Sequence, residues 1–280
     1  MRISGKKLCN SLKREFAATL PPVPYPLQIL FAALLGVSFG SFGTMLLYRI
    51  PRGETFFGRS KCPQCGETLR WYDLIPVFSF LTLGGRCSHC GHAISWRYPF
   101  IEAVTALLFA LVVAKHAMGP WVTLITLLLS GYSLLLIAFY DFETKRIPDV
   151  FVTVLFLAAL LHQVCLLTEH PDIPLRAAFI GAAIPLAFFG GLWLLSHGGW
   201  IGSGDILLGA AMGLLLGFEM TFIALFFAYL MGAIAAFLLI LLRLVDKDST
   251  LAFGPFLASG TLLALLTGDA FLAQYQRLFF

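Results

Sequence analysis

The fold of this chain is decided by residues 120–140, PWVTLITLLLSGYSLLLIAFY, which contain no charged side chain. A helix needs about 20 mainly apolar residues to cross the ~30 Å hydrocarbon core of a bilayer. Asp141 follows directly and returns the chain to polar sequence. Similar apolar runs occur on both sides, so the sequence predicts an all-α integral membrane protein with about eight transmembrane helices. The predicted spans are 27–48, 99–117, 120–140, 150–167, 177–196, 206–218, 220–242 and 251–272.

The composition agrees with a chain that lipid surrounds. Of its 280 residues, 59% are hydrophobic and 12% are charged, whereas soluble domains carry about 25% charged residues. A net charge of +4 in such a chain reflects the loops that orient it and does not indicate nucleic-acid binding. Residues 1–26 are polar and lack a short apolar core before a cleavage site. We therefore expect an amphipathic segment on the membrane surface, not a cleaved signal.

The orientation of the spans is predicted from basic residues in the loops. Residues 49–98 form the longest polar segment, and alternation of the spans places loops 141–149, 197–205 and 243–250 on the same side. These four loops contain 11 Lys and Arg residues, against 8 on the opposite side. Cytosolic loops are usually enriched in Lys and Arg. The sequence therefore predicts that the four loops are cytosolic, although the basic N-terminus argues against it.

Four of the six cysteines form two CxxC pairs, Cys62 with Cys65 and Cys87 with Cys90, and 21 residues separate the pairs. Two intervening residues let one turn present both thiolates to a metal, and two such turns complete a tetrahedral site. A closed four-thiolate site leaves no open coordination position. The sequence thus predicts a structural zinc ion in loop 49–98. Iron in the same cage, two disulfides, or a neighbouring histidine as a ligand are the alternatives.

Two aspartates at predicted membrane boundaries are candidates for catalysis. Asp141 ends the third span, and Asp205 lies 64 residues later, directly before the sixth span. Two spans intervene, so both aspartates emerge on one membrane face. Two carboxyl groups that share a site do not both ionise easily, and one then acts as an acid and the other as a base. Gly202 and Gly204 would let an extended peptide approach Asp205. Alternatively, the aspartates are interfacial caps or partners of neighbouring basic residues.

Further polar and small residues suggest packing roles. Glu102 lies just inside the second span, five residues after Arg97, and an interfacial ion pair between them would anchor that span. Gly36 and Gly40 lie four residues apart in the first span. Small residues at this spacing let two membrane helices approach closely.

Five motifs in this order resemble those of the type IV prepilin peptidase family, over nearly the whole chain. Together they are far more specific than any one of them. The motifs are Gly40–Phe42 with Tyr48–Pro51, the loop run from Cys62 to Glu102, Asp141 with Ile147–Asp149, Gly202–Asp205, and Phe253–Ala258.

The resemblance implies a bacterial inner-membrane enzyme with its active site on the cytosolic side. Members of that family cleave short basic leader peptides from prepilins and type II secretion pseudopilins. Many then N-methylate the new N-terminus, with S-adenosylmethionine as methyl donor. The resemblance makes Asp141 and Asp205 the catalytic residues and ties methyl transfer to the cysteine-bearing loop. Gly85, Arg97 and Glu102 stand as the family has them and are the methyltransferase candidates.

The predicted spans and the motifs divide the chain into four parts. These are a polar segment at 1–26, the first transmembrane helix at 27–48, a cytosolic zinc-binding loop domain at 49–98, and a multi-span aspartic peptidase domain at 99–280.

The chain also departs from the family pattern. Thr44 replaces an asparagine, Leu207 replaces a lysine two residues after the second aspartate, and Leu251-Ala252 replaces Ile-Pro. The missing lysine removes a positive charge near Asp205. A non-catalytic membrane assembly factor of a pilus or secretion system, docking partners through the zinc loop, is the main alternative function. A proton-coupled transporter is disfavoured, because the acids lie at a membrane face and not at the midplane.

Overall fold

The structure is a computed structural model that describes residues 24–279, except 56, 118, 170–174 and 245–250. The predicted polar segment 1–26 thus lies outside the described residues, apart from 24–26. The described residues form helices and two isolated β-bridges. Seven helices among them are long and apolar enough to cross a membrane, which confirms the all-α membrane class. They are α2 (Tyr25–Arg49), α4 (Arg97–His116), α5 (Trp121–Thr144), α6 (Asp149–Glu169), α7 (Leu175–Leu195), α8 (Ser203–Leu241) and α9 (Gly254–Phe279).

The longest helix, α8, is broken near its middle. Gly217 has φ 76° and ψ −178°, which are not helical angles. In a straight helix Asp205 and Tyr229 would lie about 36 Å apart along the axis, yet both line one cavity. The chain therefore turns back at Gly217. The two halves of α8 correspond to the sixth and seventh predicted spans, which the structure joins in one of its seven long apolar helices.

A side chain from α6 supports the break in α8. The amide of Gln163 donates hydrogen bonds to the carbonyl oxygens of Leu214, at 2.8 Å, and Leu215, at 3.2 Å. The last carbonyl groups of a helix have no partner within the helix, and in lipid each unsatisfied group costs several kcal/mol. Gln163 thus caps the first half of α8 inside the protein.

The first two spans pack through glycines. A Cβ atom on Gly36 would lie 2.7 Å from Cα of Ala106, and one on Gly40 would lie 2.6 Å from Cα of Glu102. No side chain fits at either distance, so the glycines let the backbones of α2 and α4 meet. This confirms the packing role predicted for Gly36 and Gly40.

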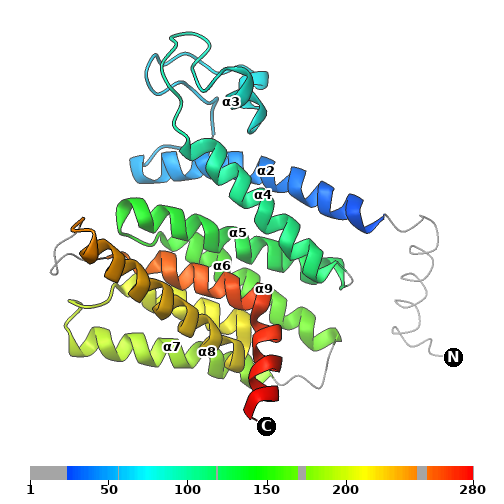
Figure 1. The fold of residues 1–280 in the computed structure, drawn as a ribbon, viewed down its shortest axis with the longest axis vertical. Coiled ribbons are helices and arrows are strands. Elements are labelled where there is room, and N and C mark those ends of the chain that lie inside the picture. Colours follow the sequence, from blue (N-terminus) through cyan, green and yellow to red (C-terminus); the bar gives the residue numbers. More distant parts are fainter. Residues whose placement is uncertain (1–23, 56, 118, 170–174, 245–250, 280) are drawn as a thin grey trace.

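The remaining helices form a layered bundle (Figure 1). α4 contacts α5, α5 contacts α6 and α9, and α8 packs on α6, α7 and α9. Fully buried side chains such as Leu134 and Ile137 of α5 and Leu208 and Met212 of α8 form its core. Many other apolar side chains of these helices are exposed, as expected where lipid is the solvent.

The loop between α2 and α4 is held to the end of α2. The guanidinium of Arg49, the last residue of α2, donates to the carbonyl oxygens of Thr55 at 3.1 Å and Gly58 at 3.2 Å. The loop therefore begins in a fixed position relative to the spans. Its short helices are η1 (Ile50–Arg52), η2 (Trp71–Leu74) and α3 (Phe78–Thr82).

Candidate active site and cysteine cluster

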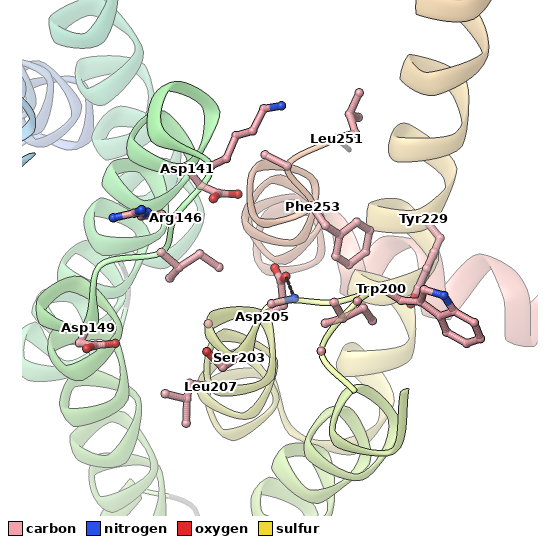
Figure 2. A pocket seen from close by; sticks show the side chains of 18 residues that line it. Asp141, Arg146, Asp149, Trp200, Ser203, Asp205, Leu207, Tyr229, Leu251 and Phe253 are labelled. Carbon is pink, nitrogen blue, oxygen red and sulfur yellow. Dashed lines mark hydrogen bonds between the residues drawn. The ribbon is translucent and has the colours of Figure 1, made fainter. Parts of the chain in front are cut away.

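A cavity of about 690 Å³ lies where α5 ends and α8 begins. Asp141 and Asp205 both line it, and Figure 2 shows them on neighbouring helices around the same space. The two carboxyl groups are near enough to interact electrostatically. The structure thus brings together the two aspartates that the sequence singled out, from helices that are far apart along the chain.

Asp141 is positioned by the start of α9. It lies in the last turn of α5, with 4% of its surface exposed. The backbone amide of Gly254 interacts with its carboxylate. A Cβ atom on Gly254 would lie 2.6 Å from Oδ2 of Asp141, so no other residue fits there without displacing the carboxylate. The first residue of α9 is therefore part of the wall that orients Asp141.

Asp205 is the third residue of α8 and closes the turn that begins it. Its Oδ2 accepts a hydrogen bond from the N–H of Gly202 at 3.3 Å, and its own N–H donates to the carbonyl of Gly202 at 3.1 Å. Its Oδ1 is buried and has no hydrogen-bond partner among the described residues. One oxygen thus holds the turn, and the other remains available to a water molecule or a ligand in the cavity.

The two glycines before Asp205 have packing roles in the structure. A Cβ atom on Gly204 would lie 2.8 Å from Cβ of Ile147, in the turn after α5. One on Gly202 would lie 3.4 Å from Oδ2 of Asp205. Gly204 therefore lets α8 begin close to the end of α5, which draws the two aspartates together. The role predicted for Gly202 and Gly204 in admitting a peptide stays a prediction.

The cavity also contains residues for which the sequence indicated no role at the site. Tyr229 comes from the second half of α8, and Trp200 and Phe253 come from the segments before α8 and α9 (Figure 2). Gly217 is the sequence feature that could have indicated Tyr229. A turn at Gly217 places residues side by side when they lie equally far before and after it, as Asp205 and Tyr229 do. Leu207, which replaces the lysine of the family pattern, also lines the cavity and is half exposed.

The four cysteines of the CxxC pairs form one cluster. Their sulfur atoms all lie within 4.8 Å of one another, and the structure contains them as free thiols. A zinc ion with Zn–S bonds of about 2.3 Å holds its sulfurs about 3.8 Å apart, so the cluster fits one tetrahedral ion. In each pair the amide of the following glycine donates to the carbonyl of the first cysteine at 2.9 Å, Gly66 to Cys62 and Gly91 to Cys87.

The cluster is chemically suited to metal binding. The backbone amide of Cys65 is the main factor that lowers the pKa of the Cys62 thiol, to about 7. A thiolate, not a thiol, is the metal ligand. The cluster therefore includes a thiol whose pKa is lowered toward that of a metal-binding thiolate.

The predicted ion pair between Arg97 and Glu102 is wrong. Nε of Arg97 lies 2.6 Å from Oε1 of Glu143, so Arg97 joins the start of α4 to the end of α5. Oε2 of Glu102 accepts a hydrogen bond from the N–H of Val77, at 2.7 Å. Residues five apart do not share a helix face, as residues three or four apart do. Their positions on α4 therefore direct Arg97 and Glu102 to different neighbours.

The third methyltransferase candidate, Gly85, shapes the loop. It has φ 68°, and a Cβ atom on it would lie 3.1 Å from the ring of Phe80. Arg97 and Glu102 are each engaged by a different partner, as described above. The roles predicted for Gly85, Arg97 and Glu102 in methyl transfer stay predictions.

Comparison with known proteins identifies the family. Residues 34–116 match the Bacterial Peptidase A24 N-terminal domain, and residues 127–237 match the Type IV leader peptidase family. A prepilin leader peptidase/N-methyltransferase of Bacillus subtilis is 35% identical over 90% of this chain and 98% of its own length. Proteins of the same name from Neisseria gonorrhoeae and Klebsiella pneumoniae are 31% and 37% identical, over 88% and 75% of this chain and 92% of each relative. No solved structure matches the chain significantly. The chain therefore belongs to the type IV leader peptidase family.

Proposed function

We propose that the chain is a membrane-embedded aspartic endopeptidase that removes the leader from prepilins and pseudopilins, and that it N-methylates the new N-terminus. The observation that carries the peptidase activity is the cavity that Asp141 and Asp205 share. The names of the relatives, which are 30% or more identical over most of the chain, support prepilins as the substrate class.

In the proposed mechanism, one of the two aspartates is a carboxylate and the other retains its proton. The carboxylate removes a proton from a water molecule, whose oxygen attacks the scissile carbonyl carbon. The protonated aspartate donates its proton to the carbonyl oxygen. Collapse of the tetrahedral intermediate breaks the C–N bond, and the leaving nitrogen takes up a proton. The Oδ1 of Asp205, which has no hydrogen-bond partner among the described residues, supports this scheme, because the reaction needs a carboxyl oxygen that is open to water or substrate.

The cleavage site is proposed to face the cytosol of a bacterial inner membrane. Both aspartates and the cysteine cluster lie on the side where basic loop residues predominate, and thiolate ligands persist in a reducing compartment. Single cysteines in a background with the native cysteines removed can test the orientation, provided that the protein still cleaves. A cysteine in the segment 52–60 should resist an impermeant thiol reagent in intact cells. Labelling without lysis would contradict the proposed orientation.

We also propose that Cys62, Cys65, Cys87 and Cys90 hold one zinc ion. The sulfur spacing of the cluster supports this. Such an ion would be structural, since four thiolates leave no position for a substrate or water. The loop at 49–98 is then a zinc-binding unit attached to the peptidase region at 99–280.

The methyltransferase activity is proposed from the names of the relatives, with S-adenosylmethionine as the donor that supplies the methyl group. Gly85, Arg97 and Glu102 are proposed to act indirectly, through the shape of the loop. A bulky residue at Gly85 or Glu102→Gln should then reduce methylation and spare cleavage.

One experiment tests both activities. The full chain is co-expressed with a prepilin, and the N-terminus of the product is read by mass spectrometry. We expect a shortened product that carries the mass of one added methyl group. An intact prepilin at normal protein levels would refute the peptidase and favour an assembly factor. A shortened product without the methyl group would leave only the peptidase.

A further inference from the structure

The loop between α2 and α4 has an apolar face that no described residue covers. Leu74, Ile75, Phe78 and Leu81, called here the loop face, are 41%, 37%, 60% and 66% exposed. Phe80, in α3 with Phe78 and Leu81, points the other way, is 8% exposed and packs against Trp96 with ring centroids 4.7 Å apart. The segment therefore carries apolar side chains on both sides, and the described residues cover only the inward one. An apolar patch exposed to water marks a site of binding to protein or membrane, or of aggregation.

The loop face lies beside the spans. The N–H of Val77, in the middle of this segment, bonds to Oε2 of Glu102 at 2.7 Å, and Glu102 packs against Gly40 of α2. Glu102 is five residues beyond Arg97, the start of α4, or about 7 Å along that helix at ~1.5 Å per residue. Gly40 is nine residues before Arg49, the end of α2, or about 13 Å along that helix. Val77 thus lies nearer to the middle of the bilayer than Arg49 and Arg97, the basic residues at the ends of α2 and α4.

This position is held by the fold. Val77 has φ 61°, a backbone conformation that costs about 1–3 kcal/mol for a β-branched residue. The buried Glu102 carboxylate accepts its N–H and so maintains that turn. Arg49 fixes the start of the loop at the end of α2. In Figure 1, α3 accordingly lies over the middle of α2 and not beyond its end.

We propose that the loop face is inserted into the cytosolic interface of the bilayer that the spans cross, beside α2 and α4. Helices that lie in a membrane surface are buried about 5–10 Å into the boundary between headgroups and acyl chains. Glu102, which accepts the N–H of Val77, lies about 7 Å from the start of α4, within this range. α4 also presents apolar side chains to lipid, and Phe100 and Leu107 are 59% and 58% exposed.

The residues around the loop face suit the same surroundings. Trp71 and Tyr72 precede it, and both are exposed; these two residue types concentrate at membrane interfaces. Arg70 and Arg86 lie before and after it and are exposed, where they can meet anionic headgroups. The ligand is therefore a lipid surface with negative charge. This inference needs only that the spans cross a membrane, so it stands apart from the proposed peptidase activity.

Quenching of tryptophan fluorescence by brominated lipid tests the proposal in the full-length protein. The five native tryptophans are replaced by Phe, and one tryptophan is returned as Leu81→Trp or Phe78→Trp. Leu107→Trp marks the lipid-exposed surface of α4, and Glu67→Trp marks an exposed position of the cysteine cluster outside the loop face. Each variant is reconstituted in vesicles of zwitterionic and anionic lipid, brominated near the ester end of the acyl chains. Zinc content checks that each loop is folded.

We expect the tryptophans at 81 and 78 to lose fluorescence about as much as the one at 107, and the one at 67 to lose none. Equal behaviour at 81 and 67 would overturn the proposal. Shielding of position 81 from an aqueous quencher, without quenching by the lipid, would mean that protein covers the loop face and would also overturn it. Shielding that appears only when a prepilin is added, or only at a high ratio of protein to lipid, would identify the substrate or a second copy as that cover.

Discussion

The cavity with the aspartates and the cysteine cluster are built in opposite ways. The cluster comes from two short turns of one loop, and each turn is shaped by its own backbone hydrogen bonds. The cavity takes Asp141, Asp205, Tyr229 and Phe253 from four segments spread over more than a hundred residues. The cluster is therefore specified by local sequence, whereas the cavity depends on the packing of the whole bundle. Substitutions should therefore affect the cluster only when they lie in its own loop. The cavity should also respond to substitutions in distant parts of the bundle.

Removing a carboxylate from the cavity should have the largest effect. Asp141→Asn or Asp205→Asn should lower the rate of prepilin cleavage by about 10³-fold or more, because residues that act as a unit fail together. Initial rates with purified variants in detergent measure this loss. Asp269→Asn is the matched control, because Asp269 pairs with Lys115 at 2.8 Å on the opposite membrane face. Substantial cleavage by either active-site variant would contradict the aspartic mechanism.

The second-largest effect should be loss of the metal ion when one of its cysteine ligands is replaced. The helical bundle should remain folded. Cys62→Ser should reduce the zinc content, measured by elemental analysis, from about one ion per chain to near zero, because a structural site needs all four ligands. Cys165→Ser, outside the cluster, should keep the zinc. Helix content should be unchanged in both variants. A zinc-free wild-type protein with two disulfides would refute the metal site.

A change in the packing around the cavity should have an intermediate effect. Gly254→Ala places a methyl group where Oδ2 of Asp141 lies 2.6 Å away, and the carboxylate must move. A misplacement of about 1 Å can cost about 10²-fold in rate. Gly190→Ala, where nothing lies within 4 Å, should cleave normally. Equal rates for the two variants would show that Gly254 does not position Asp141.

The break in α8 should contribute to stability. Gly217→Ala forces a side chain into a backbone conformation that is essentially restricted to glycine and should cost about 1–3 kcal/mol. The variant should unfold at a temperature several degrees lower in the same detergent. Gly191→Ala, with open space around it, is the control. An unchanged midpoint for Gly217→Ala would contradict the sharp turn.

The contact between the two regions should have the smallest effect. Arg97 and Glu143 are each about one-third exposed, so their ion pair should be worth less than about 1 kcal/mol and should weaken with salt. A double-mutant cycle of Arg97→Gln and Glu143→Gln on thermal unfolding measures the coupling. The Lys115–Asp269 pair on the other face provides the comparison. A coupling well above 1 kcal/mol would mean that the loop and the cavity form one unit.

Sequence reasoning succeeded where the signal is local. Apolar runs located the spans, CxxC spacing located the cluster, and the even number of intervening spans placed Asp141 and Asp205 on one face. It did not find Tyr229 or the role of Gly254 beside Asp141, since both depend on how helices pack after the chain turns back at Gly217. It also paired Arg97 with Glu102 wrongly. The five-residue spacing on one helix already argued against that pair. The actual partners, Glu143 and Val77, depend on helix rotation and loop conformation, which no periodicity in the sequence records.

The break at Gly217 also affects how the chain enters the membrane during synthesis. The first half of α8, residues 203–216, extends only about 21 Å and cannot cross a ~30 Å core alone. Its end carbonyls depend on Gln163 of α6. This half must therefore insert as a hairpin with 218–241, after α6 is already in the bilayer. Synthesis from the N-terminus provides that order, so α6 acts as a template for the helix that carries Asp205.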